Sequence, residues 1–358
     1  METGLLAGSG ASATQEAIAV AVELLGKGEV VALPTETVYG LAANALDPIA
    51  VARIFEAKSR PSFDPLIVHL PDGDWLEKIS NVQPRDRSLV ARLAEEFWPG
   101  PLTLVLPKRE IVPGIVTAGL DTVAVRISAH PIFAEIIREF GKPLAAPSAN
   151  RFGRISPTTA RHVIDELSGR IPLIVDAGPC THGIESTILA IHDGKMEILR
   201  RGPITAEQLR SIGFQPVDVI DRQDTDTATI RAPGQLPSHY APKTALQLID
   251  DAESFVPKEN QRVALLAWNP RSCPAADKTK RRSGDRHPLG FVAIRHLSES
   301  QDLREAAANL FGYLRELDRM DVDLIVAERV PAQGLGAAIL DRLTRAAHGS
   351  PDAPGKLQ

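Results

Sequence analysis

The sequence predicts an α/β protein with an open, twisted mixed sheet and helices, followed by a smaller, Rossmann-like parallel α/β domain. At 358 residues the chain is longer than one ordinary core supports. Short apolar runs alternate with segments of helical spacing along most of it, and a polar stretch with prolines interrupts this pattern. We therefore expect four parts: a disordered tail at 1–14, a first domain at 15–214, a linker at 215–242 and a second domain at 243–350.

The first domain is expected to alternate helices and strands. Thr14 is placed to cap a helix over Gln15–Leu25, and Asp47 with Pro48 begins a helix that reaches Lys58. Helical spacing also predicts helices over 85–98 and 131–140, and either Thr158 or Thr159 is placed to cap a further helix that reaches Leu167. Apolar runs predict strands at 30–33, 66–70, 102–106, 123–127, 144–146, 173–175, 186–191 and 195–199, the last two joined as a hairpin.

The second domain shows a different pattern, in which strands and helices alternate as they do in a parallel sheet. The expected strands cover residues 246–249, 263–268, 291–294 and 324–327. The expected helices cover residues 303–317 and 335–347.

Composition excludes several classes of protein. With 44% hydrophobic and 24% charged residues the chain is typical of a soluble globular protein. A net charge of -5 and 4% aromatic residues argue against a stable nucleic-acid surface. Cys180 and Cys273 are too few for a disulfide scaffold or a cysteine-rich zinc finger. The sequence contains neither a signal peptide pattern nor an apolar run of about 18 residues, so we expect a cytoplasmic protein without a membrane partner.

The segment KSRPSFDPLIVH, Lys58 to His69, places two cations on a short loop between a helix and a buried strand. Pro61 and Pro65 restrict this loop, which lowers the entropy cost of binding an anion such as a polyphosphate. A second interpretation is that Lys58 and Arg60 only complement the helix dipole in water. The segment by itself leaves both open.

Other polar residues gather at the predicted strand ends, where open α/β sheets commonly bind ligands. They are Thr35, Thr37, His69, Thr122, Arg126, Ser148, Asn150, Glu185 to Thr187 and Arg200. Hydroxyls and cations outnumber carboxylates, and no nucleophile–base pair, P-loop or metal-ligand spacing is present. This inventory favours binding of a phosphate-bearing and a carboxylate-bearing substrate, with catalysis by orientation and charge neutralisation.

Individual members of this set also have structural interpretations. Thr37 and Ser148 are equally typical of turns, and His69 is typical of a core histidine. Arg126, inside the apolar run TVAVRIS, needs a partner, which is either a ligand or an internal ion pair.

Six motifs in family order resemble the YrdC-like threonylcarbamoyl-adenylate synthases. They are LPTETVYGL (33–41), KSRPSFDPLIVH (58–69), FWPGPLTLVLP (97–107), TVAVRIS (122–128), APSANRFGRISPT (146–158) and GIESTIL (183–189). APGQLPSHYAP (232–242), followed by a second α/β domain, is similar to the linker of the long, two-domain form.

The resemblance implies a reaction in which L-threonine, bicarbonate and ATP give L-threonylcarbamoyl-AMP and pyrophosphate. The product would pass to a downstream tRNA threonylcarbamoyl transferase, which modifies adenosine 37 of tRNA. Mg²⁺ would be bound through the ATP phosphates, without metal ligands from the protein.

The resemblance also implies roles for single residues. The catalytic residues would be Lys58 and Arg60. The threonine-binding residues would be Thr37, His69, Arg126, Ala146 and Ser186. The ATP-binding residues would be Arg60, Asp64, Thr122, Ser148, Asn150, Ser156, Arg200 and Ser238. Two positions depart from the family pattern: Asp64 stands where asparagine is frequent, and Arg201 where proline is frequent.

Two alternatives belong to other classes. One is a carbamoyl-phosphate-dependent carbamoyltransferase, although the relatives of that kind carry cysteine-rich zinc fingers, which two cysteines cannot supply. The other is a non-catalytic RNA-binding module whose basic residues hold backbone phosphate.

Overall fold

A computed structural model describes residues 2–8, 10–218, 220, 230–236, 239–270 and 290–348. It divides into two compact units, which we describe separately. The first comprises Met1–Phe152 and Ser156–Gln235, and the second Gly153–Ile155 and Leu236–Gln358. Within the described ranges, no helix is both long enough and apolar enough to cross a membrane.

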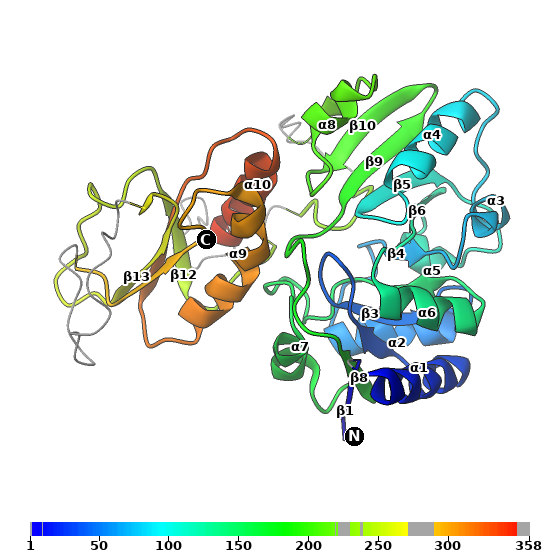
Figure 1. Cartoon of the computed structure of the whole chain (residues 1–358), viewed down its shortest axis with the longest axis horizontal. Coiled ribbons are helices and arrows are strands. Elements are labelled where there is room, and N and C mark those ends of the chain that lie inside the picture. The colour runs from blue at the N-terminus through cyan, green and yellow to red at the C-terminus, as the bar shows by residue number, and fades with distance from the viewer. Residues whose placement is uncertain are drawn as a thin grey trace. The chain divides into compact units, whose positions relative to one another are not determined.

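The first unit is built on one large mixed sheet (Figure 1). Its strand order is β1-β8-β2-β3-β7-β4-β6-β5-β9-β10-β11. The strands are β1 Gly4–Ala7, β2 Val31–Leu33, β3 Gly40–Asn44, β4 Ile67–His69, β5 Leu102–Pro107, β6 Thr122–Arg126, β7 Leu144–Ala145, β8 Leu173–Asp176, β9 Thr187–His192, β10 Lys195–Arg200 and β11 Val217–Asp218. The helices are α1 Ala11–Gly26, α2 Pro48–Lys58, α3 Asp74–Ile79, α4 Arg87–Phe97, α5 Gly114–Thr117, α6 Pro131–Phe140, α7 Ala160–Leu167 and α8 Ala206–Ser211.

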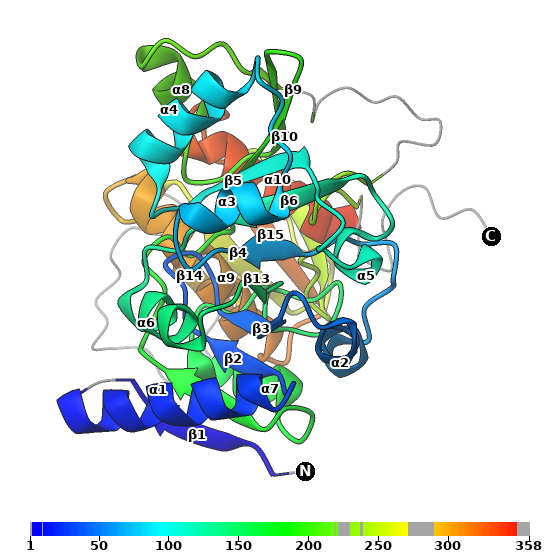
Figure 2. The same cartoon turned by 90° about the vertical axis from the view of Figure 1, so that its right-hand side faces the viewer.

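Two groups of helices bury most of this sheet. Helices α1 and α6 pack side by side in both views and cover part of it with a core that includes Ile18, Phe133 and Ile136 (Figure 2). Helices α2, α4, α5 and α7 contribute to a larger core, to which α2 adds Val51 and Ile54. The helices thus bury the apolar stripes that the sequence predicted.

A third part of the sheet surface has no helix among its core residues. Its cluster comes from strands β4, β5, β6, β9 and β10 and from one residue of the segment after β11; the members are Ile67, Val105, Ala124, Ile188, Ala190, Leu199 and Ala232. The alternate residues of these strands, such as Val68 and Val125, point into the larger core on the opposite face. One face of β4-β6-β5-β9 is therefore left for other contacts.

The second unit contains a separate sheet in which every pair of strands is parallel. The order is β12-β15-β13-β14, with β12 Ala245–Ile249, β13 Val263–Ala267, β14 Ala293–His296 and β15 Leu324–Glu328. Helices α9 Leu303–Asp318 and α10 Leu335–His348 pack against each other (Figure 1). The predicted fold class, a large mixed sheet and a small parallel one, is confirmed.

Several local expectations were wrong. The tail expected at 1–14 instead contributes β1, which pairs in parallel with β8 at Gly4–Leu173 and the following residues. Thr14 lies inside α1 rather than capping it, since its hydroxyl donates to the carbonyls of Gly8 and Gly10 at 2.9 and 2.8 Å. Short or alanine-rich strands such as β1 and β3 are hard to predict from the local sequence, because pairing with neighbouring strands determines whether they form.

The domain boundary expected at residue 214 also differs from the structure. Strand β11, within the expected linker, pairs with β10 and extends the first sheet. Arg201, one of the departures from the family pattern, donates to Asp218 of β11 across 2.7 Å. The boundary between the two compact units lies instead between Gln235 and Leu236.

Candidate functional site

The register of the strands brings several predicted site residues onto one face of the sheet, the face that carries the cluster of Ile67 and Ala124. His69 of β4 pairs with Arg126 of β6, and Ile67 pairs with Ala124, so that all four side chains point to one side. Val105 of β5 pairs with Ala124, and Thr103 two residues earlier lies on the same side. The polar side chains of His69, Arg126 and Thr103 thus lie toward one end of this face. The apolar side chains of Ile67, Ala124 and Val105 lie next to them along the strands.

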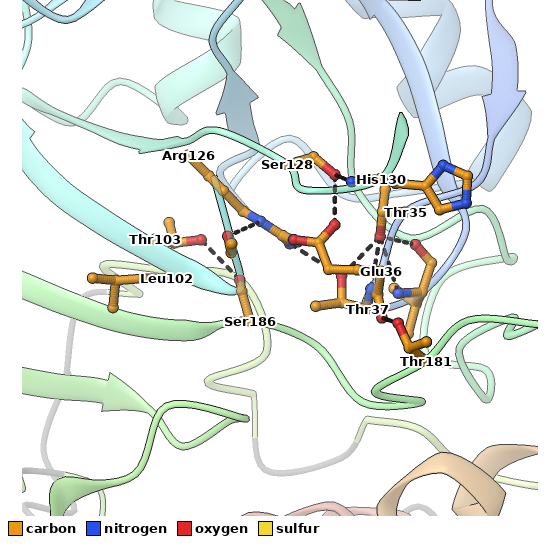
Figure 3. A network of polar contacts seen from close by, with 12 residues as sticks. Thr35, Glu36, Thr37, Leu102, Thr103, Arg126, Ser128, His130, Thr181 and Ser186 are labelled. Carbon is orange, nitrogen blue, oxygen red and sulfur yellow. Dashed lines mark hydrogen bonds and ion pairs between the residues drawn. The ribbon is translucent and has the colours of Figure 1, made fainter. Parts of the chain in front are cut away.

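Arg126 is the centre of a buried polar network that we call the Arg126 cluster, with Glu36, Thr37 and Ser128 (Figure 3). Its Nη2 pairs with Glu36 Oε1, its Nη1 donates to Thr37 Oγ1 at 3.0 Å, and its Nε donates to the Gly100 carbonyl at 3.1 Å. The other Glu36 oxygen accepts from the Ser128 hydroxyl at 2.5 Å. The sequence left open whether Arg126 has an internal ion pair; it does.

Glu36 is ionised in this environment. Burial by itself would raise its pKa, but the Arg126 charge and the hydrogen bonds from Ser128 and Arg126 outweigh burial and lower the pKa to about 2. The cluster therefore holds a fixed negative charge beside a fixed positive one.

His69 lies next to Arg126 and is 3% exposed. Burial, with a smaller contribution from the Arg126 charge, lowers its pKa to about 3, so the imidazole is neutral. Its ring packs on Phe133, with 4.7 Å between centroids. Within the described part of the chain, Nδ1 has no hydrogen-bond partner, unlike the nitrogen of a satisfied core histidine.

Ser186, a predicted threonine-binding residue, contacts Arg200, a predicted ATP-binding residue. Arg200 Nη2 donates to the Ser186 hydroxyl and Arg200 Nε to the Ser186 carbonyl, both at 3.0 Å. The Ser186 hydroxyl also lies 2.8 Å from Thr103 Oγ1 (Figure 3). Arg200 further donates to the Pro233 carbonyl at 3.3 Å. The segment that follows β11 therefore contacts the site from within the first unit.

Lys58 ends helix α2, whose C-cap Ser59 adopts the left-handed conformation. Its ammonium is buried and donates to the main-chain carbonyls of Ser148 and Asn150. Burial and the nearby Arg60 charge lower the pKa of Lys58 well below its usual range. Lys58 thus fastens the loop that carries two predicted ATP-binding residues.

Arg60 and Asp64 form the other half of this region, which together with Lys58 we call the Lys58 cluster. Arg60 donates to the carbonyls of Asp64 and Pro65 at 3.2 and 2.9 Å, and its Nη2 lies 2.9 Å from Asp64 Oδ2. That ion pair lacks hydrogen-bond geometry, and neither Asp64 oxygen accepts a hydrogen bond within the described residues. Burial raises the pKa of Asp64 despite the Arg60, Lys58 and Arg200 charges.

The remaining predicted residues lie at different places. Thr122 begins β6, four residues before Arg126 and so about 13 Å from it along the strand. Ala146 follows β7 and donates its N–H to the Ile67 carbonyl at 3.0 Å. The buried Ser156 donates its hydroxyl to Glu185. Ser238 lies outside the described residues.

Sequence reasoning missed three members of these networks: Glu36, Thr103 and Ser128. Glu36 stands between two threonines in PTETVYG, and Ser128 ends TVAVRIS, so both lie inside motifs that were recognised. A buried arginine requires a counter-ion, and this rule predicts that a carboxylate exists without saying which one.

The described residues contain no group of three or more His, Cys, Asp or Glu side chains that could hold a metal ion. Mg²⁺ usually keeps several waters and takes one or two carboxylates together with substrate phosphates.

Comparisons with known proteins cover both units. A family model described as "Telomere recombination" matches residues 23–202, and one described as "Threonylcarbamoyl-AMP synthase, C-terminal domain" matches residues 204–348. The threonylcarbamoyl-AMP synthase of Pyrococcus abyssi is 39% identical over 331 residues, which are 92% of this chain and 93% of the relative. The enzyme of that name from Bacillus subtilis is 40% identical over 333 residues, 93% of each chain.

A solved structure is similar over the same extent. The crystal structure of P. abyssi Sua5 complexed with L-threonine has a TM-score of 0.82 and 35% identity to this chain, and the match covers 98% of both.

Proposed function

The chain belongs to the threonylcarbamoyl-AMP synthase family, and we propose that it joins L-threonine, bicarbonate and ATP into threonylcarbamoyl-AMP with release of pyrophosphate. The observation that carries this proposal is the presence of two separate clusters with buried basic side chains at one sheet, the Arg126 cluster and the Lys58 cluster. Arg126 and His69 lie at the ends of β6 and β4, while Arg60 and Lys58 lie before β4. Two substrates of different chemistry can therefore be held at once.

The Arg126 cluster suits the amino-acid substrate. A guanidinium binds a carboxylate through two parallel N–H···O bonds, and the neutral His69 offers an acceptor for a hydroxyl. We therefore assign L-threonine to Arg126, His69 and Thr37, with Ser186 and Ala146 beside them.

The Lys58 cluster suits the nucleotide. The basic side chains of Arg60, Lys58 and Arg200 all lie near Asp64, and we expect them to neutralise the triphosphate charge. Lys58 also holds the loop of Ser148 and Asn150. Mg²⁺ bound through the phosphates would supply further charge neutralisation. The remaining members of the proposed ATP site are Asp64, Thr122, Ser156 and Ser238.

The reaction then needs orientation rather than a protein nucleophile. The amino nitrogen of threonine and bicarbonate form a carbamate with loss of water. A carbamate oxygen attacks the α-phosphorus of ATP, the bond from that phosphorus to the β-bridging oxygen breaks, and pyrophosphate leaves. We expect the buried side chains of Lys58 and Arg60 to stabilise the charge on the departing pyrophosphate.

We also propose that the product is consumed in the cytoplasm by a tRNA threonylcarbamoyl transferase that modifies adenosine 37. An acyl phosphate anhydride is reactive, so a group transfer must follow soon after its release.

The experiment is a pyrophosphate-release assay with ATP and bicarbonate. Stimulation by threonine, with less by serine and none without an amino acid, is expected; no stimulation by threonine would refute the proposal. Carbamoyl phosphate in place of ATP and bicarbonate tests the carbamoyltransferase alternative. Salt-sensitive tRNA binding without ATP turnover would favour the RNA-binding module.

A further inference from the structure

Among the residues that the structure describes, the hydrogen bonds of Arg126 account for three of its five N–H groups. Nε donates to Gly100, one Nη1–H to Thr37 and one Nη2–H to Glu36. One N–H therefore remains on each terminal nitrogen. A carboxylate takes two such groups on adjacent nitrogens when it binds a guanidinium bidentately.

Glu36 is itself fixed by contacts that do not involve Arg126. Its second carboxylate oxygen accepts from Ser128, and its main-chain carbonyl accepts from the His182 N–H at 2.9 Å and from the Thr181 hydroxyl at 3.3 Å. Figure 3 shows the Glu36 side chain between Arg126 and Ser128. The carboxylate is thus held from two other segments and can define where the guanidinium lies.

We propose that Glu36 is a positioning residue for amino-acid binding: it orients the Arg126 guanidinium so that the two remaining N–H groups are presented to the substrate carboxylate. This inference rests on the proposed function, in which Arg126 binds the carboxylate of threonine. A long arginine side chain loses less conformational freedom on binding when its geometry is already set.

The charge of Glu36 contributes to the same effect. Arg126 is 3% exposed, and a buried cation without a counter-ion would be costly in the empty enzyme. Because the pKa of Glu36 is about 2, the carboxylate stays ionised over the whole range in which the enzyme can be assayed. The positioning effect should therefore not vary between about pH 5 and pH 9.

The test is the Glu36→Gln variant of the full chain, which keeps the shape of the side chain and removes its charge. Calorimetric titration should show L-threonine binding weakened about tenfold, which corresponds to about 1.4 kcal/mol. L-Threoninol, which lacks the carboxylate, should bind the variant and the parent enzyme within about twofold of each other, since it does not use the oriented guanidinium. ATP affinity should also be unchanged within about twofold. Glu23→Gln, on the exposed face of α1, is the matched control.

Equal weakening of threonine and threoninol would overturn the inference, because it would indicate a disrupted pocket. Unchanged threonine affinity would overturn it as well. Arg126→Lys separates this result from the proposed function: if that variant binds threonine normally, the assignment of Arg126 itself fails. If only Arg126→Lys weakens binding, Glu36 is not a positioning residue.

If Glu36→Gln does not fold, the Ser128→Ala variant tests the same inference. Loss of the 2.5 Å hydrogen bond frees one oxygen of Glu36 without removing any charge. Threonine binding should then weaken about threefold, with threoninol again unaffected. Parent-like threonine affinity in this variant would contradict the inference.

Discussion

Glu36 and Asp64 are both buried carboxylates beside an arginine, yet their surroundings shift their pKa values in opposite directions. Glu36 accepts hydrogen bonds from Arg126 and Ser128, and its pKa falls to about 2. Asp64 lies close to Arg60 but accepts no hydrogen bond within the described residues, and burial raises its pKa. Proximity of opposite charges is therefore not sufficient to stabilise a buried carboxylate; hydrogen-bond geometry decides.

The same difference separates the two clusters of the site. In the Arg126 cluster both oxygens of the carboxylate accept hydrogen bonds, one from Arg126 and one from Ser128. In the Lys58 cluster, Asp64 lies near the basic side chains of Lys58 and Arg60, and Arg200 is also close enough to affect its pKa. Asp64 nevertheless accepts no hydrogen bond within the described residues.

The largest effect is expected from Lys58→Met. The substitution keeps most of the side-chain volume but removes both hydrogen bonds to the loop of Ser148 and Asn150. Turnover in the pyrophosphate assay should fall about 1000-fold, because this loop and the cationic cluster would lose their fixed geometry. Lys27→Met, at an exposed salt bridge, is the control. A loss of less than about tenfold would show that the Lys58 cluster does not depend on its ammonium.

Replacing Glu36 or Asp64 by the corresponding amide should change the free energy of unfolding in opposite directions. Glu36→Gln should lower the free energy of unfolding at pH 7 by about 3 kcal/mol, because it weakens the counter-ion of a buried arginine. Asp64→Asn should raise it by about 1 kcal/mol, because it removes a buried carboxyl group whose charged form is disfavoured by burial. Urea unfolding monitored by tryptophan fluorescence would measure both. Changes of the same sign would mean that the two carboxylates are equivalent.

The comparison also predicts how stability depends on pH. The pKa of Glu36 is lower in the folded chain than its ordinary value of 4.5, so its contribution is present above pH 4.5 and is lost as the pH falls toward 2. The pKa of Asp64 is raised above 3.8, so its contribution is lost as the pH rises through the folded pKa. In acid titrations, the Glu36→Gln variant should approach the parent enzyme as the pH falls below 4.5, and a gap that stays constant would contradict this.

The smallest effect is expected at His69, where the predicted result is no titration. Its pKa of about 3 keeps the imidazole neutral between about pH 5 and pH 8. The NMR signals of its ring protons should not shift over that range. A His69 transition near pH 6 would show that the ring carries a charge beside Arg126.

Much of the site could be predicted from the sequence because its residues lie in short, ordered motifs. Periodicity placed β4, β6 and α2 closely, and the motifs placed Lys58, Arg60, His69 and Arg126 at or beside their ends. The six motifs also indicated the family, which the comparisons confirm over both units.

The sequence by itself determined which residue types are present, which elements they end, and that Arg126 needs a partner. Only the tertiary structure decided which partner it has, because strand pairing and loop return bring Glu36 to Arg126 across 90 positions of the chain. It also decided that Asp64 lacks hydrogen bonds and that Lys58 fastens a loop. Local propensity acts over a few residues, whereas a buried charge is stabilised by whichever groups the whole fold places around it.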